Sequence, residues 1–151
     1  MCDLLLTEVL LDQLNQRSHG LLGVFTCSPD GEGLPLHHAE RQDAKDALRV
    51  NLLVGAGPCE DDDLGPSVGQ VYAIYLVAEC WGRGIGRDLL QRAETDLGSA
   101  GYQGASLWVL TTNDRARRFY EAAGWRPDGT HKIEPFGGAE LDEIRYRKQL
   151  L

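Results

Sequence analysis

The sequence predicts one α/β domain, an α+β arrangement in which helices pack on a mixed β-sheet. Its 151 residues suit a single domain over residues 1–151, and its hydrophobic fraction of 42% and charged fraction of 25% are ordinary for a globular protein. From Val50 onward the expected elements follow the order β-β-α-β-α-β-β. Two strands that flank a helix imply a right-handed parallel crossover, so we expect parallel and antiparallel pairs in one sheet.

The first third of the chain gives few structural signals. Apolar residues recur at helical spacing over Leu4–Leu14, and a second, short helix is expected over His38–Leu48. Between them, Cys27–Pro35 is rich in glycine and proline and predicts a loop. The compact apolar run Val50–Ala56 predicts a buried strand, because Gly57-Pro58 follows it.

The middle of the chain is easier to interpret. Glu60–Pro66 predicts a charged loop of the hairpin type, and the β-branched and aromatic residues of Gln70–Val77 predict a strand. A glycine-rich turn follows this strand directly. Beyond the turn, Ile85–Leu97 has apolar residues on one face of a helix that we expect to end near Gly101. Ala105–Leu110 predicts another buried strand.

The C-terminal part predicts one short helix and two strands. Asn113 or Asp114 can cap a helix that runs to Ala123, and Gly124 is placed to end it. The two strands are expected over Arg126–Phe136 and Glu140–Lys148, joined around Gly137-Gly138.

Composition narrows the classes of partner and compartment. A formal net charge of -8 repels phosphate backbones, so nucleic acid is not expected as a partner. The same charge would attract a cationic amine, and it is equally consistent with simple solubility. No run approaches the ~20 apolar residues of a membrane span, so we expect no membrane association. The cysteines form no CxxC pair and have no histidine at metal-ligand spacing, which favours reduced thiols, a cytoplasmic protein and no metal. They are Cys2, Cys27, Cys59 and Cys80.

The turn between the expected strand and helix carries the chemistry. It reads Trp81-Gly82-Arg83-Gly84-Ile85-Gly86-Arg87. A helix N-terminus offers unpaired backbone N–H groups and partial positive charge, and glycines let these groups approach an anion such as a pyrophosphate. The spacing matches neither the G-x-G-x-x-G of dinucleotide sites nor a phosphate-binding loop with Gly-Lys-Ser/Thr. Taken alone, the glycines are equally consistent with a tight turn that binds nothing.

A second motif adds a family resemblance. Leu107–Asn113, followed by Ala116-Arg-Arg-Phe119-Tyr120-Glu-Ala-Ala-Gly124-Trp125, resembles the GNAT superfamily of N-acetyltransferases. In that family the acyl-CoA motif reads Arg/Gln-x-x-Gly-x-Gly/Ala. This chain has both glycines, with Trp81 at the first position. The resemblance covers roughly Leu53–Leu150.

The resemblance implies the GNAT fold, a twisted and mostly antiparallel sheet whose central parallel strands splay apart, flanked by helices. In the family the pantetheine arm of acetyl-CoA lies in that gap. The main chain of Ile74, Tyr75 and Leu76 would therefore bind pantetheine, and the Leu76 N–H would polarise the thioester carbonyl. Tyr120 matches the tyrosine that protonates the departing CoA thiolate, although it also suits the apolar face of a helix. The implied cofactor-binding residues further include Trp81, Gly82, Arg83, Gly84, Ile85, Gly86, Arg87 and Asn113.

The acceptor half of the site is poorly marked. Asn113 suits either a hydrogen bond to pantetheine or a plain helix cap. Gln70 stands where some family members have a glutamate base, and it cannot act as one. Tyr72, Tyr75 or a water chain could relay the proton instead, and Asp61–Asp63 could line the entry for the amine. The N-terminal strand of the family is either missing here or replaced by Leu21–Phe25.

Three functions remain open from the sequence. The first is an acetyl-CoA-dependent N-acetyltransferase that acts on a primary amine of a small molecule or peptide; the resemblance is also compatible with a homodimer formed through sheet edges. The second is a non-catalytic acyl-CoA-binding or protein-interaction module with the same fold. The third, a nucleotide-binding oxidoreductase, fits worst because the glycine spacing is wrong and no ribose-binding carboxylate follows.

Overall fold

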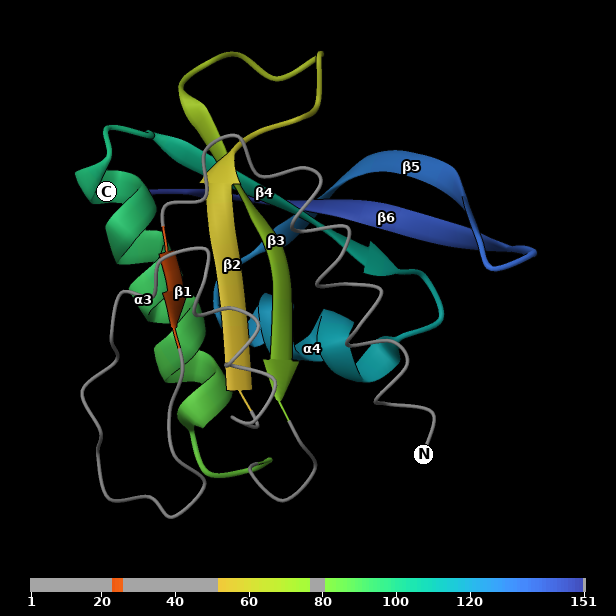
Figure 1. The fold of residues 1–151 in the computed structure, drawn as a ribbon, viewed down its shortest axis with the longest axis horizontal. Coiled ribbons are helices and arrows are strands. Elements are labelled where there is room, and N and C mark those ends of the chain that lie inside the picture. Colours follow the sequence, from red (N-terminus) through yellow and green to blue (C-terminus); the bar gives the residue numbers. More distant parts are fainter. Residues whose placement is uncertain (1–22, 26–51, 77–80, 151) are drawn as a thin grey trace.

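The computed structural model describes residues 23–25, 52–76 and 81–150, which form one six-stranded sheet and two helices (Figure 1). The elements are β1 Gly23–Phe25, β2 Leu52–Pro58, β3 Val68–Leu76, α3 Ile85–Ser99, β4 Gly104–Leu110, α4 Asp114–Ala122, β5 Arg126–Phe136 and β6 Ala139–Gln149. The helices expected over Leu4–Leu14 and His38–Leu48 lie outside the described residues.

The sheet is mixed, as the sequence predicts. Its strand order is β1-β2-β3-β4-β6-β5, and β3–β4 is the parallel pair while the other neighbours run antiparallel. The parallel pairing is short, from Val68↔Gly104 to Gln70↔Ser106. Beyond it β4 runs away from β3 and joins the β5–β6 hairpin, so the sheet opens into two arms (Figure 1).

Two strand boundaries differ from the sequence prediction. β2 covers Leu52–Pro58 and ends two residues later than the expected Ala56, because its ladder with β3 continues to Pro58↔Gly69, while the expected start at Val50 lies outside the described residues. β3 correspondingly begins at Val68 and ends at Leu76. Main-chain pairing extends these strands beyond the apolar runs, and apolar patterning does not report such pairing. At the sheet edge, β1 pairs antiparallel with β2 and lies within Leu21–Phe25, the segment considered as a substitute strand.

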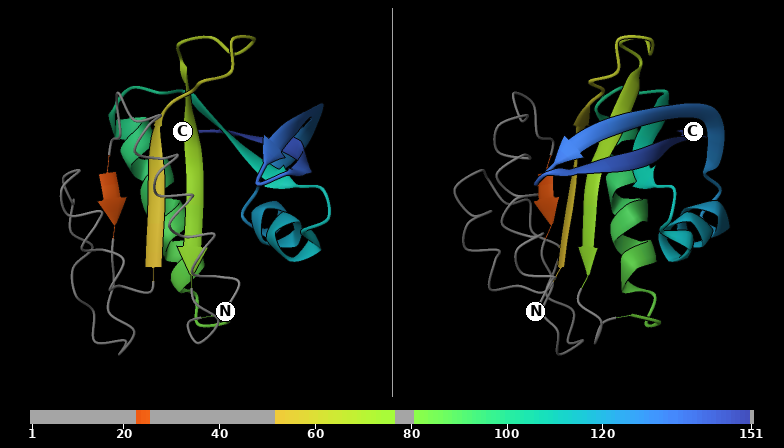
Figure 2. Two further views of the ribbon diagram at one scale, coloured as in Figure 1. Left: turned by 45° about the vertical axis from the view of Figure 1, so that its right-hand side comes forward. Right: turned by 90° about the vertical axis from the view of Figure 1, so that its right-hand side faces the viewer.

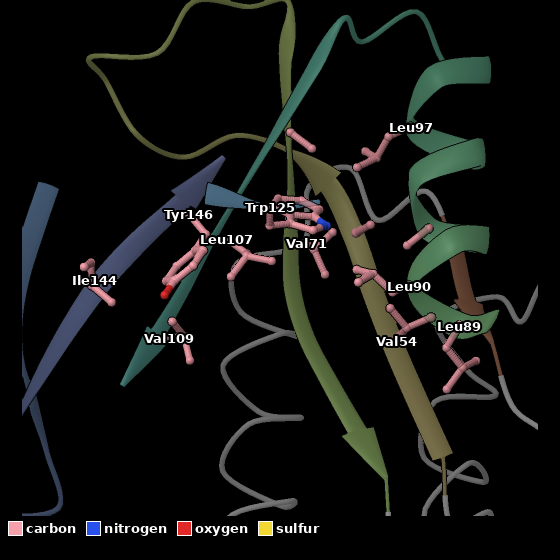
Figure 3. Close-up of a cluster of buried hydrophobic side chains, with 13 residues drawn as sticks. Val54, Val71, Leu89, Leu90, Leu97, Leu107, Val109, Trp125, Ile144 and Tyr146 are labelled. Atoms are coloured by element: carbon pink, nitrogen blue, oxygen red, sulfur yellow. The ribbon is translucent and has the colours of Figure 1, made fainter. Parts of the chain in front are cut away.

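Both helices lie on the same face of the sheet (Figure 2). α3 buries Leu89, Leu90, Ala93 and Leu97 against the strands, and Figure 3 shows the three leucines on the α3 side of the core and Tyr146 on the β6 side. Gly69 permits the close approach of α3 to β3, because a Cβ there would lie 2.6 Å from Leu97 Cδ2. In the part of the chain that the structure describes, neither helix is long and apolar enough to cross a membrane.

Candidate active site

The open arm of β3 is the first component of the candidate site. Beyond Gln70, β3 continues for six residues, of which all but Tyr72 at a β-bulge pair with β2 on one side, as far as Leu52↔Leu76. Within the described residues these six have no strand partner on the β4 side. Ile74, Tyr75 and Leu76 therefore lie on a strand whose free edge can bind an extended ligand through main-chain hydrogen bonds.

The glycine turn lies at the end of this arm and starts α3. Gly82 and Gly84 have φ values of 71° and 82°, a left-handed region that a side chain disfavours. The helix begins at Ile85, and its first hydrogen bond runs from Asp88 N to Gly84 O at 3.1 Å. The N–H groups of Ile85, Gly86 and Arg87 precede that bond and lack an intrahelical acceptor.

The space beside this turn is open. A Cβ added to Gly82 or Gly84 would meet no atom within 4 Å. Arg83 and Arg87 are exposed on either side of Gly84. Open space, N–H groups without an intrahelical acceptor and two exposed arginines are features that a phosphate site uses, and phosphate binding here remains a prediction. The seven residues of the predicted anion-binding motif thus lie together at one helix N-terminus.

Trp81, the first residue of the turn, is 46% exposed and covered on one face by an arginine. The guanidinium carbon of Arg115 lies 3.3 Å from the centroid of the Trp81 ring. Arg115 was not singled out from the sequence, because a run of Arg-Ala-Arg-Arg on a short helix is typical of a solvated face. No sequence signal marks its contact with a residue 34 positions earlier.

Tyr120 lies on α4, close to where the parallel strands part. Its ring centroid is 6.4 Å from that of Tyr146, and Tyr146 pairs with Leu107, one residue beyond the last β3–β4 pair. Phe119 and Trp125 pack against the same ring, edge to face. Burial raises the pKa of Tyr120 to about 12. The phenol is therefore neutral, and able to donate a proton, throughout the physiological range.

A hydrogen-bond network holds α4 in this position. Tyr146 is fully buried, and its hydroxyl donates to Glu121 at 2.7 Å and accepts from Arg117 at 3.1 Å. Arg117 also donates to the Thr111 carbonyl, which joins the helix to the end of β4. Because Glu121 follows Tyr120 directly, the network fixes the part of the helix that carries the candidate acid.

Asn113 acts as a helix cap. Its side-chain oxygen accepts a hydrogen bond from Ala116 N at 3.1 Å, and α4 begins at the next residue, Asp114. Gly124 has a φ of 91° and follows the end of α4, as the sequence predicts. The capping role is thus confirmed, while a contact of Asn113 with pantetheine remains a prediction.

Gln70 has a structural role. It is 6% exposed, and its side-chain oxygen accepts from Glu60 N at 3.0 Å, which fixes the start of the β2–β3 loop. Beside it the Cys59 thiol lies 3.3 Å from the Ser106 hydroxyl, and burial raises the pKa of that thiol. Position 70 therefore holds an amide with a structural hydrogen bond, and not a carboxylate that could act as a base.

Arg145 ties the β2–β3 loop to β6. It is 3% exposed, donates two 2.7 Å hydrogen bonds to the Asp63 carboxylate and one of 2.7 Å to Asp128. The hydrogen bonds from Arg145 hold the pKa of Asp63 below its usual value. Asp61 lies 3.5 Å from Arg145 and accepts from Trp108 Nε1. Two of the three aspartates considered for the amine entry therefore bind Arg145, which the sequence did not mark.

The chain is similar in sequence to known acetyltransferases. The model of the Acetyltransferase (GNAT) family matches residues 11–125. The chain is 35% identical over 65 residues to a mycothiol acetyltransferase of Beutenbergia cavernae, covering 43% of this chain and 22% of that protein. It is 37% identical over 59 residues to an uncharacterized N-acetyltransferase of Archaeoglobus fulgidus, covering 39% of this chain and 40% of that protein. The match spans less than half the length of either curated relative.

The fold is also similar to solved structures. A Bacillus subtilis acetyltransferase in complex with CoA has a TM-score of 0.53 with this chain, at 13% sequence identity. The similarity covers 68% of this chain and 70% of that one. At this identity the likeness concerns the fold alone.

Proposed function

The chain belongs to the acetyltransferase (GNAT) family, and on that premise we propose that it transfers an acetyl group from acetyl-CoA to a primary amine of a small molecule or peptide. The observation that carries the proposal is that, among the described residues, β3 has no partner on its β4 side beyond Gln70, and that the glycine turn follows this strand in the chain. Pantetheine is an extended chain with amide groups, so it suits a free strand edge. A pyrophosphate suits the helix N-terminus that follows.

The reaction is a direct attack. The neutral amine nitrogen bonds to the thioester carbonyl carbon, and the carbonyl oxygen becomes an oxyanion that the Leu76 N–H stabilises. When the C–S bond breaks, its electron pair leaves with the sulfur, and Tyr120 gives that thiolate its phenolic proton. The nitrogen loses one proton to solvent, and Tyr120 regains one. The products are an N-acetylated amine and CoA.

Tyr120 suits the role of acid because of its surroundings. Its pKa, raised to about 12 by burial, keeps the proton on the phenol until a stronger base such as a thiolate forms nearby. No hydrogen bond to its hydroxyl is found among the described residues, so that group can turn toward a substrate. Packing by Phe119, Trp125 and Tyr146 restricts the ring.

The amine must reach the site without its proton. Gln70 is not a base, and its side-chain oxygen accepts a hydrogen bond from Glu60 N. We therefore propose that a weakly basic or already neutral amine is the acceptor, or that water carries the proton away. The net charge of -8 attracts amines in their cationic form to the surface, where a weakly basic amine can lose its proton to water before it enters the site.

A second function is favoured by the same glutamine. A chain that binds acyl-CoA and lacks a carboxylate at position 70 could serve as a binding or interaction module without turnover. Gln70 supports this alternative because its buried amide performs a structural task.

Turnover separates the two functions. Acetyl-CoA is incubated with the full chain and a panel of amines and peptides with free N-termini, and released CoA thiol is measured. Acetyltransfer predicts thiol release that depends on one class of amine. Binding of acetyl-CoA without thiol release above background across the panel would establish the module instead.

A further inference from the structure

The two arms of the sheet are bridged at their open end by a stacked pair. Trp81 follows β3, and Arg115 is the second residue of α4, which follows β4. The guanidinium carbon of Arg115 lies 3.3 Å from the centroid of the Trp81 ring. The two side chains are thus in contact although the last pair between β3 and β4 is Gln70↔Ser106. The contact therefore lies between the glycine turn and the helix that carries Tyr120.

Stacking leaves the guanidinium of Arg115 able to bind an anion. A guanidinium that lies flat on an aromatic ring keeps its N–H donors in its own plane, pointing outward from the stack. Among the described residues, Arg115 has no hydrogen bond and no carboxylate partner. The side chain is exposed, as is almost half of Trp81. The pair is thus a fixed cation with its donors open to solvent.

The ligand that this cation suits is a phosphate. The Arg115 guanidinium lies beside a turn whose N–H groups and two arginines already favour an anion. This positive group occurs in a chain whose overall charge is -8. We propose that Arg115 is a phosphate ligand of the CoA nucleotide, and that Trp81 is the positioning residue that holds its guanidinium beside the glycine turn. The proposal rests on the proposed function, because it concerns the same co-substrate. CoA offers two sources of the anion, the pyrophosphate and the ribose 3′-phosphate.

The test is a double-mutant cycle on binding. Kd values for CoA and for dephospho-CoA are measured by isothermal titration with the wild type, Arg115→Ala, Trp81→Leu and the double variant. A lost charge-assisted contact predicts about tenfold weaker CoA binding by Arg115→Ala. If Trp81 acts through Arg115, the change Trp81→Leu weakens CoA binding when it is made in the wild-type chain. The same change has little effect when it is made in the Arg115→Ala variant. Trp81→Phe, which keeps an aromatic face, restores most of the affinity.

The two cofactors identify the phosphate. Equal binding of dephospho-CoA by the wild type and Arg115→Ala assigns the contact to the 3′-phosphate; weaker binding of both cofactors by the variant assigns it to the pyrophosphate. Arg147→Ala, an exposed arginine on β6, controls for the change in net charge and should leave both Kd values unchanged. Circular dichroism confirms that the variants fold.

Three results would overturn the proposal or part of it. Wild-type affinity for both cofactors in Arg115→Ala overturns the assignment of Arg115 while leaving the proposed function intact. Additive losses in the cycle overturn the positioning role of Trp81. Failure of the wild type itself to bind CoA would overturn the proposed function and this proposal together, and is thereby distinguished from the first result.

Discussion

Gln70 of β3 pairs with Ser106 of β4, and this is the last pair before the two parallel strands part. Up to this point the sheet is continuous; beyond it, in the part of the chain that the structure describes, β3 pairs with β2 alone. The parting leaves main-chain groups of β3 without a strand partner beside a glycine turn that starts a helix. The proposed chemistry depends on this divergence.

Replacing Tyr120 with phenylalanine tests the proposed acid. The variant keeps the ring and its packing but cannot protonate the thiolate, so kcat should fall about a hundredfold while the Kd for acetyl-CoA stays unchanged. Steady-state kinetics and titration measure both. Tyr102→Phe, on a partly buried tyrosine beside Gly69, is the matched control and should keep full activity. An unchanged kcat in Tyr120→Phe would exclude the acid role.

Gly84→Ala tests the turn. A Cβ at Gly84 meets no neighbour, but the φ of 82° is strained for alanine by roughly 1–2 kcal/mol. Relief of that strain would turn the N–H groups at the start of α3 away from the phosphate, so CoA binding should weaken. Gly65→Ala, in an equally open position without a positive φ, serves as control in the same titration. Equal Kd values for the two variants would contradict the role of the turn.

Arg145→Met tests the tie between the β2–β3 loop and β6. It removes a buried cation from Asp63 and Asp128 and leaves their carboxylates without it, which should cost about 3 kcal/mol in the free energy of unfolding. Urea denaturation measures the loss. Arg147→Met, on the same strand but exposed, should change stability little. Similar midpoints for the wild type and Arg145→Met would show that the tie does not stabilise the fold.

Alkaline pH should destabilise the protein in part through Tyr120. Its folded pKa of about 12 exceeds the usual value near 10, so the folded state holds the proton more tightly than the unfolded state. This contribution is complete below pH ~10 and is lost as the pH rises toward ~12. Chemical denaturation at several alkaline pH values should therefore show a shallower loss for Tyr120→Phe than for the wild type. Burial also raises the pKa of Tyr146 and Tyr72, so the comparison with the variant isolates Tyr120. Parallel curves would refute the pKa assignment.

The sequence predicted the elements that local chemistry determines. α4 begins after Asn113 and ends before Gly124, because a side-chain cap and a left-handed glycine act on their own helix. The hairpin of β5 and β6 likewise follows from the glycine pair between its strands. The glycine turn was recognised because its donors are backbone groups whose direction the helix start decides.

Long-range contacts were not predictable in the same way. Asp63 and Arg145 are 82 positions apart, and neither residue differs in its sequence surroundings from an ordinary surface charge. The stack of Arg115 on Trp81 depends on how the two arms of the sheet diverge, which no local pattern specifies. The start of β3 was missed for a related reason, since the ladder with β2, rather than apolar alternation, sets where it begins.

The most direct test of the central claim is a calorimetric titration of the full chain with acetyl-CoA. An open β3 edge that leads to an anion-binding turn predicts saturable, one-to-one binding with a micromolar Kd, and competition by CoA. Absence of micromolar binding by the folded chain would contradict the claim that the space between β3 and β4 is an acyl-CoA site.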